Sequence, residues 1–281
     1  MNRTALAPCE TASAQSTPVA RPPLFASPWS LGGIASIAPR LYNTLHRSVF
    51  SKRALSSRSK ELAEIRRFAE QPSDIDEHLE MMFTETLLCG PNVIVELGVR
   101  GGASTFVFER AAALCSAALV SVDIDDCSFV SHYPQWHFVK GDDVEFASHF
   151  PEFCRMKNIV PSVDVLFIDT SHYYDHTVQE IQAWMPLMSA RAKIMFHDTN
   201  MRLVGPRKDG CFQMAWDNQR GVIRSIEEYL STEIDESKPY TECVNGWLVR
   251  HSPYCNGFTI MDRLSCNSDE LNRHGLVTKN Q

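Results

Sequence analysis

Apolar segments five to seven residues long recur along the chain from residue 92 onward, and patterns with helical periodicity separate them. Near-continuous apolar runs with helical crossovers are typical of parallel strands that are covered on both faces of a sheet. The last two runs are separated only by residues 252–255, which is too short for a crossover, so they predict an antiparallel hairpin at the sheet edge. The predicted strands cover 92–97, 118–124, 136–140, 164–169, 192–198, 245–251 and 256–262, and the predicted helices cover 103–115, 142–158, 174–188 and 222–230.

The pattern divides the chain into four parts. Six prolines within residues 1–39 leave too little apolar surface to fold alone, and the following stretch to residue 60 predicts a short basic amphipathic helix. That helix could dock weakly on the domain, touch a membrane surface or belong to an organellar targeting region. The predicted parts are a disordered, basic leader at 1–60, a helical extension at 61–90, an α/β domain at 91–263 and a loose polar tail at 264–281.

The extension is predicted to contain two helices, Lys60 to Phe68 and Asp74 to Leu88. Ser73 followed by Asp76 has the spacing of a capping box at the start of the second helix. An apolar stripe on this helix predicts packing against the sheet.

Composition limits the class of protein. The hydrophobic fraction of 44% in 281 residues is enough for a sizeable core. The net charge is −7, with +7 on residues 1–60 and −14 on the remainder, which argues against nucleic-acid binding by the domain. Nine scattered cysteines without a Cys-x-x-Cys pair favour a reduced, cytoplasmic protein. No apolar run approaches the roughly 18 residues of a spanning helix, so no transmembrane segment is predicted.

A glycine-rich turn follows the first predicted strand. Glu96 lies near the strand end, Gly98 and Gly101 follow it, and Ser104 opens the next helix. Glycines permit a sharp bend and close approach of a ligand, while the amides at a helix start offer donors. The carboxylate of Glu96 at this edge suits an adenosine-type ligand, which offers hydroxyl or ammonium donors. The spacing Glu-x-Gly-x-x-Gly-Gly differs from the Gly-x-Gly-x-x-Gly of pyrophosphate binding. The alternative is a turn that binds nothing.

Acidic residues also stand where the next predicted strands end. Asp169 ends the fourth strand, His172 follows at the start of a helix, and Asp198 ends the fifth strand. Ligands of open α/β sheets bind at this edge. Two carboxylates on adjacent strand ends repel each other, and a divalent cation would relieve that repulsion. In the alternative interpretation these residues only cap helices.

Five parallel strands, a final hairpin and a glycine turn after the first strand resemble the class I S-adenosylmethionine-dependent methyltransferases over residues 92 to 262. The resemblance implies that residues 91–263 form a methyltransferase domain, with a Rossmann-like methyltransferase sheet and S-adenosyl-L-methionine as cofactor. It further implies that Asp123 accepts hydrogen bonds from the ribose hydroxyls and that the loop with Asp142 and Asp143 borders the adenine. Asp125 could replace Asp123, the acidic turn could be only a surface feature, and Asp142 could simply cap a helix.

The segment from Asp169 to His172 together with Asp198 resembles the metal-dependent sugar and antibiotic O-methyltransferases, a group with macrolide sugar methylases and cephalosporin-hydroxylase-like proteins. The resemblance implies Asp169 and Asp198 as metal ligands, with Mg²⁺ or Mn²⁺ as the ion, and His172 as general base. His197 stands where that family has an acid. It is either a softer ligand that favours manganese or iron, or it faces away because neighbouring strand residues alternate, which is the interpretation we favour.

The predicted reaction is methyl transfer to a hydroxyl of a small molecule or sugar, with His172 near its ordinary pKa of about 6.5 as the base. A lid is predicted over 200–217, whose cations Arg202, Arg207 and Lys208 either attract a polar or anionic acceptor or are merely solvated. His176 is interpreted as a surface or capping residue. Core packing rather than substrate stacking is expected for Trp216, Trp247 and Phe258.

Two other classes of function stay open. One is a nicotinamide-dependent oxidoreductase, which the glycine spacing opposes, and the other is a methyltransferase-like binding module without catalysis. The acceptor, the metal and homo-oligomerisation also stay open.

Overall fold

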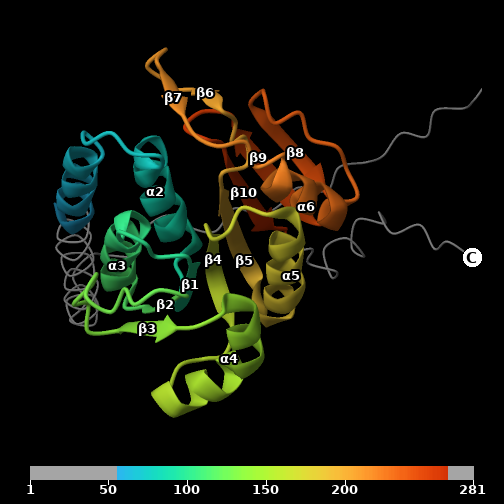
Figure 1. Cartoon of the computed structure of the whole chain (residues 1–281). Helices are drawn as coiled ribbons and strands as arrows, with labels where there is room; N and C mark the ends of the chain where they lie inside the picture. The colour runs from blue at the N-terminus through green and yellow to red at the C-terminus, as the bar shows by residue number, and fades with distance from the viewer. Residues whose placement is uncertain (1–55, 265–281) are drawn as a thin grey trace, which may run out of the picture. The chain divides into compact units, whose positions relative to one another are not determined.

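The computed structural model describes residues 56–264, and the predictions for residues 1–55 and for 265–281 lie outside this range. Its centre is a sheet of eight strands in the order β3-β2-β1-β4-β5-β10-β9-β8. Strands β1 to β5 are parallel, β10 is antiparallel to β5, and β9 and β8 continue antiparallel (Figure 1). The strands are β1 Val93–Leu97, β2 Ala118–Asp123, β3 Trp136–Lys140, β4 Val163–Ile168, β5 Met188–His197, β8 Tyr240–Val244, β9 Trp247–Ser252 and β10 Phe258–Arg263.

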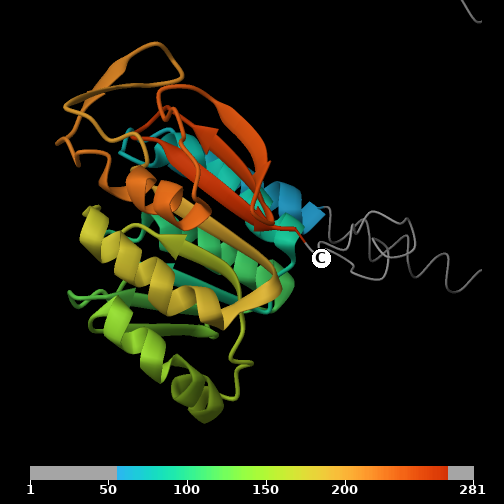
Figure 2. The same ribbon diagram turned by 90° about the vertical axis from the view of Figure 1, so that its right-hand side faces the viewer.

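Helices cover both faces of the sheet, as the near-continuous apolar strands require. On one face the core includes Phe150 of α4, Trp184 of α5 and Ile226 of α6, all fully buried. On the other face it includes Ile65 of the helix over 56–68, Met82 of α2 and Phe108 of α3. Figure 1 shows the two helix layers on either side of the sheet, and Figure 2 looks onto the layer of α4, α5 and α6. The helices are α2 Leu79–Cys89, α3 Ala103–Cys115, α4 Asp143–Lys157, α5 Tyr174–Trp184 and α6 Gly221–Leu230, with short 3-10 helices η1 Asp76–His78 and η2 Met185–Leu187.

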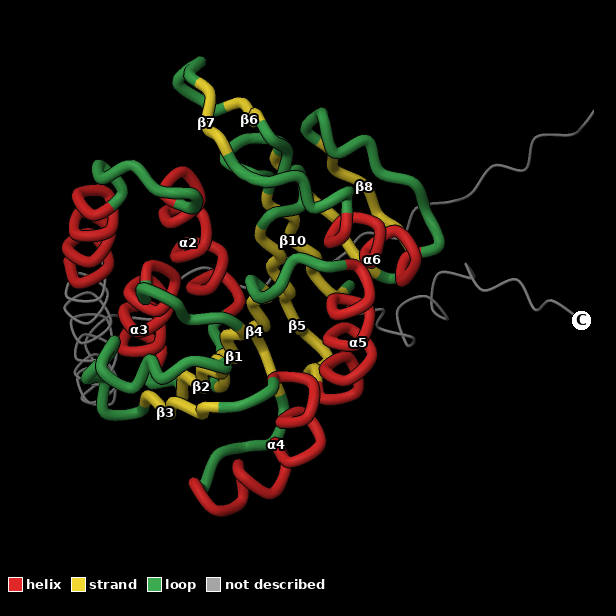
Figure 3. The backbone as a smooth tube through the Cα atoms, viewed as in Figure 1, coloured by secondary structure: helices red, strands yellow, loops and turns green. Residues whose placement is uncertain are grey.

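The predicted class, a parallel sheet with an antiparallel C-terminal hairpin flanked by helices, is confirmed. The hairpin of β9 and β10 lies one strand inside the edge, because the unpredicted strand β8 pairs with β9. A second unpredicted element is the small hairpin of β6, Val204–Pro206, and β7, Phe212–Met214 (Figure 3). Strands of three residues are too short for an alternating pattern to identify them in the sequence.

The start of the second helix differs from its prediction. The chain forms η1 first, α2 begins only at Leu79, and Ile75 precedes η1 without a side-chain cap. Ser73 Oγ instead accepts a hydrogen bond from Ile75 N at 3.3 Å. The predicted capping box is therefore wrong. The reason is that the Asp76 carboxylate accepts a hydrogen bond from Arg207, which lies in a distant loop. Within residues 56–264 no helix is long and apolar enough to cross a membrane.

Candidate active site

A cavity of about 480 Å³ opens at the carboxyl ends of the parallel strands. Its volume is in the range of small-molecule sites. The predicted cofactor residues that line it are Gly98, Gly101, Ser104, Asp123, Asp142 and Asp143, and Asp169, His172 and Asp198 line it too. The structure therefore brings nearly all of the sequence-predicted residues to one site.

The glycine turn after β1 is shaped by close backbone contact. Gly98 has a φ of +88°, which side chains rarely adopt, and a Cβ there would lie 2.0 Å from the carbonyl oxygen of Asp169. Its amide donates to Val122 O at 2.9 Å. Only glycine fits between the ends of β1, β2 and β4, which is how this turn sets the distance between the two halves of the cavity.

Glu96 is an exception among the predicted cofactor residues, because its side chain points into the protein. It is fully buried, does not line the cavity, and accepts hydrogen bonds from Thr105 at 2.9 Å and Ser121 at 2.5 Å. Burial raises the pKa of Glu96 to about 7, although hydroxyl donors oppose that rise. The expectation of a direct cofactor contact is corrected: the carboxyl group joins β1, β2 and α3 below the turn.

Asp123 supports the same turn from β2. Its Oδ2 accepts hydrogen bonds from Val99 N at 2.7 Å and Arg100 N at 3.0 Å, and its Oδ1 accepts one from Asp125 N at 2.9 Å. Burial alone would raise the pKa of Asp123, but these amides lower it below its ordinary value. Asp125 is exposed, yet it also lines the cavity. The structure thus leaves both acids within reach of a ligand.

Asp169, His172 and Asp198 converge as the strand ends predicted. His172 Nε2 lies 3.2 Å from Asp169 Oδ1 and 3.0 Å from Asp198 Oδ2. One ligand atom from each residue lies within 4.8 Å of the others. Asp198 is 2% exposed, and its Oδ1 has no hydrogen-bond partner. A buried carboxylate oxygen without a hydrogen-bond partner lowers the stability of the fold unless it binds a proton or a cation.

The position of the His197 side chain shows that the interpretation in which it faces away from Asp169 and Asp198 is wrong. Its Nδ1 lies 3.1 Å from Asp169 Oδ1 and 3.4 Å from Asp198 Oδ2, and its Nε2 donates to Asp74 O at 2.9 Å. The strand alternation fails here because Asp198 has a φ of +55°, outside the extended region. Both ring nitrogens of His197 are engaged with the protein.

The two carboxylates govern the charge of both imidazoles. Burial would lower the pKa of His172, but Asp169 and Asp198 outweigh it and raise the pKa. The same balance raises the pKa of His197 well above its ordinary value. The expected unperturbed His172 is thus wrong for the protein without a cation. A cation on the carboxylates would repel imidazolium and lower the pKa of both rings again.

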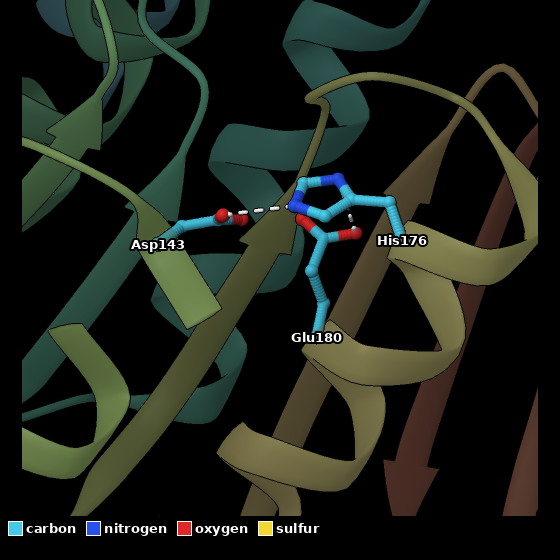
Figure 4. A group of neighbouring side chains, drawn as sticks. All are labelled: Asp143, His176 and Glu180. Atoms are coloured by element: carbon cyan, nitrogen blue, oxygen red, sulfur yellow. Dashed lines mark hydrogen bonds and ion pairs between the residues drawn. The ribbon is translucent and has the colours of Figure 1, made fainter. Parts of the chain in front are cut away.

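A second cluster of Asp143, His176 and Glu180 stands beside the first, between the start of α4 and the first turns of α5 (Figure 4). His176 Nε2 lies 3.1 Å from Asp143 Oδ1, and its Nδ1 lies 2.8 Å from Ser171 Oγ. Glu180 is fully buried, and its pKa is raised well above the ordinary value by burial and then by Asp143. The surface or capping role expected for His176 is therefore wrong. The signal available in the sequence was the i, i+4 spacing of His176 and Glu180.

Sequence reasoning also missed two further residues that line the cavity. Asp74 and Arg100 line the cavity, and Arg100 Nη2 donates to both Asp74 carboxylate oxygens at 2.8 and 2.7 Å. Asp74 precedes β1 by a whole helix, so no local pattern links it to the site.

The two arginines of the predicted lid are paired with acids of the same chain. Arg207 Nη2 lies 2.7 Å from Asp76 Oδ2, and Arg202 Nη2 lies 3.3 Å from Glu236 Oε1. Lys208 donates from its backbone amide to Glu77 Oε1 at 3.0 Å, and its ammonium group donates to the backbone carbonyl of Glu77 at 2.9 Å. The pairings of Arg202 and Arg207 favour a structural use of these two cations over attraction of an anionic acceptor.

Known proteins give the class of this domain. Residues 95–199 match the family model described as a methyltransferase domain. With the strand order above, the chain contains a class I S-adenosylmethionine-dependent methyltransferase domain, and the predicted enzyme class is confirmed. No curated protein sequence matches the chain.

Solved methyltransferase structures are similar to the chain at low identity. An O-methyltransferase from Bacillus cereus in complex with S-adenosylhomocysteine (SAH) is 13% identical, with 74% of this chain and 90% of that chain covered and a TM-score of 0.46. SAH-bound PaMTH1 from Podospora anserina is 13% identical, with 76% and 95% covered and a TM-score of 0.47. MycE of the mycinamycin biosynthetic pathway, solved with Mg and SAH, is 17% identical, with 73% and 54% covered and a TM-score of 0.47. The chain thus spans about half of MycE.

Proposed function

We propose that the protein transfers the methyl group of S-adenosylmethionine to a hydroxyl of a small molecule or sugar, assisted by a divalent cation. The observation that carries the proposal is the convergence of Asp169, His172 and Asp198 within 4.8 Å on the wall of the cavity that the glycine turn borders. Methyl transfer is an in-line displacement that requires alignment and a deprotonated acceptor. The cavity supplies a place for alignment, and the three side chains supply the acid–base chemistry.

The residues present fit a cation. Asp198 offers a buried carboxylate oxygen without a partner, and Asp169 offers a second carboxylate beside it. Carboxylate oxygens suit Mg²⁺ or Mn²⁺. We assign Asp169 and Asp198 as the ligands. When bound, such an ion lowers the pKa of a coordinated hydroxyl. His197 is assigned a positioning role, since both of its nitrogens already contact the protein.

His172 is assigned as the base. Its Nε2 faces the gap between the two carboxylates, so an acceptor hydroxyl held there would meet the imidazole at hydrogen-bond distance. A proton can move to Nε2 only when the ring is neutral. Neutralising the carboxylates favours that state, because their negative charge is what raises the pKa of His172 above its ordinary value.

The cofactor is assigned to the other half of the cavity. Gly98, Gly101 and Ser104 leave room beside the start of α3, and Asp123 provides a carboxylate at the end of β2. Asp142, which caps α4 by accepting from Glu145 N at 2.8 Å, and its neighbour Asp143 form the edge where we expect the adenine. Glu96 acts indirectly, by holding the turn. We assign catalysis to residues 91–263 as one domain.

The assignment of the ion is tested by direct binding of Mn²⁺ with and without the ligand aspartate. We expect Asp198→Asn to weaken Mn²⁺ binding at least about tenfold while SAH affinity, measured by calorimetry, stays within about twofold. Asp126→Asn is the matched control, since Asp126 is an exposed acid of the turn after β2. Mn²⁺ affinity in the Asp198→Asn protein equal to that of wild type would refute the ligand assignment.

The reaction is tested with the same wild-type protein. We expect saturable binding of SAH and none of NAD, and methyl transfer in a single turnover to a hydroxyl acceptor such as 4-methylcatechol. NAD binding in place of SAH would support the oxidoreductase alternative.

A further inference from the structure

An arm of the chain leaves the candidate active site and returns to it. It spans residues 200–218 and carries the β6–β7 hairpin, which projects beyond the sheet (Figure 1). The arm begins directly after Asp198 and Thr199, and at its far end Asn218 Nδ2 donates to Asp198 O at 2.9 Å. Both ends of the arm are therefore fastened to a proposed cation ligand.

One face of the hairpin rests on the domain. Gln213 Nε2 donates to Asn256 Oδ1 at 2.5 Å, and its Oε1 accepts from Arg207 Nη1 at 3.0 Å. Gly205, the cross-strand partner of Gln213, lies on the same side, with Asn256 Oδ1 3.8 Å from where its Cβ would stand. These polar contacts fix the orientation of the hairpin.

The opposite face is apolar and open. Successive strand residues alternate in direction, so Phe212 and Met214 point away from the contacts of Gln213. Phe212 is 73% exposed, Met214 is 86% exposed and Val204, which pairs with Met214, is 54% exposed. Leaving three such side chains in water costs free energy that burial against a ligand would recover.

This apolar face continues to the proposed base. The ladder extends past the hairpin, where Ala215 N donates to Leu203 O at 3.3 Å, so the alternation brings Trp216 onto the side of Met214. The Trp216 ring stacks on the ring of His172, with centroids 6.1 Å apart and planes inclined by 21°. Tyr173 is 62% exposed, and the centroid of its ring lies 5.5 Å from that of the Trp216 ring. The expectation that Trp216 belongs to the core is wrong, since 41% of it is exposed.

We propose that Phe212, Met214 and Trp216, here termed the arm row, bind the apolar body of the methyl acceptor, which is an amphiphile with its hydroxyl beside His172. The inference rests on the proposed function, because it names the acceptor class of that same site. Four residue steps separate Trp216 from Phe212, which is about 13 Å of extended strand. The row thus accommodates an acyl chain of medium length or a fused apolar ring system.

Charge around the arm agrees with a neutral apolar body. Arg207, which follows β6, is paired with Asp76 Oδ2 at 2.7 Å and with Glu77 Oε1 at 3.5 Å. An anionic acceptor would have to compete with these carboxylates for Arg207, whereas an apolar one meets the exposed side chains of Phe212 and Met214.

The proposal is tested with 4-alkylcatechols, whose hydroxyls serve as the acceptor probe and whose tails run from methyl to octyl. Their dissociation constants are measured by calorimetry with SAH and Mn²⁺ present, below the concentration at which the probes aggregate. We expect affinity to rise about two- to fourfold for each added methylene until the tail outgrows the row. Met214→Ser should flatten this dependence without changing the affinity for SAH.

Met156→Ser is the matched control, because Met156 is 69% exposed near the end of α4 and away from the arm. An unchanged dependence on tail length in the Met214→Ser protein, or a dependence lost equally in the Met156→Ser protein, would overturn the proposal. So would a dimer that Met214→Ser dissociates in sedimentation while tail length has no effect, because the row would then join two copies of the chain.

Failure of the proposed reaction is distinguishable from failure of this inference. A tail-length dependence that Met214→Ser abolishes supports the arm row as the binding surface even if no methyl group is transferred. Methylation of 4-methylcatechol without any tail-length dependence supports the reaction and overturns the arm row.

Discussion

Gly98→Ala tests whether the glycine turn sets the position of Asp169. The new Cβ would lie 2.0 Å from the Asp169 carbonyl oxygen, and real Cβ atoms essentially never approach another atom within 3.0 Å. One of the two segments must therefore retreat by about 1 Å, and shifts of that size at a reacting group can cost roughly 100-fold in rate. The φ of +88° adds about 1–2 kcal/mol of backbone strain, and the overlap adds about 1–3 kcal/mol.

Gly246→Ala separates the two contributions. Gly246 has a φ of +83°, but nothing lies within 4 Å of its Cβ position, so this variant carries only the strain. We expect Gly98→Ala to lower the free energy of unfolding in urea by about 2–5 kcal/mol and Gly246→Ala by about 1–2 kcal/mol. We also expect turnover to fall roughly 100-fold in Gly98→Ala alone. Equal losses of stability in the two variants, with wild-type turnover in Gly98→Ala, would refute the steric argument.

Three further predictions follow from the contacts of single side chains. His172→Ala should lower kcat by roughly two to four orders of magnitude with SAH affinity nearly unchanged, and equal activity would remove His172 as the base. Glu96 has an ordinary pKa of 4.5 and a pKa of about 7 in the folded protein, so folding is coupled to proton uptake between these two pH values. The free energy of unfolding of the wild type, relative to that of Glu96→Gln, should therefore fall as pH rises from 4.5 to about 7. The fall should be roughly 3 kcal/mol by urea unfolding, and a difference independent of pH would contradict it. Lys193→Ala should destabilise the fold by about 3–5 kcal/mol, because Lys193 is 4% exposed and its Nζ lies 2.6 Å from Glu85 Oε2, whereas an effect below 1 kcal/mol would show that Arg250 alone balances Glu85.

Much of the fold could be predicted because its signals are local. The helix over 103–115 and the strand over 136–140 have the predicted bounds, since an apolar period and a glycine or capping residue at each end need no distant partner. Helix α2 was harder to place. The contact of Asp76 with Arg207 joins residues far apart in the chain, and it replaces the capping box that the local spacing favours.

In the candidate site, too, local signals predict some features and contacts between distant residues decide others. Alternation along a strand led us to expect that His197 faces away, but a left-handed φ at Asp198 brings both side chains to Asp169. Likewise, the pKa of His172 is raised by carboxylates that follow two different strands. This rise cannot be predicted from His172 and its sequence neighbours alone. Backbone strain and the electrostatics of neighbours are settled by packing rather than by local propensity.

The amino-acid sequence by itself determined the parallel sheet, the glycine turn and the meeting of Asp169 with Asp198, because hydrophobic periodicity and strand-end position are properties of short segments. Tertiary structure alone decided that Glu96 points inward, that His176 joins Asp143 and Glu180, and that the arm turns an apolar row toward His172. These arrangements depend on contacts between segments that are distant in the chain, and their free energy exists only once the sheet has brought those segments together.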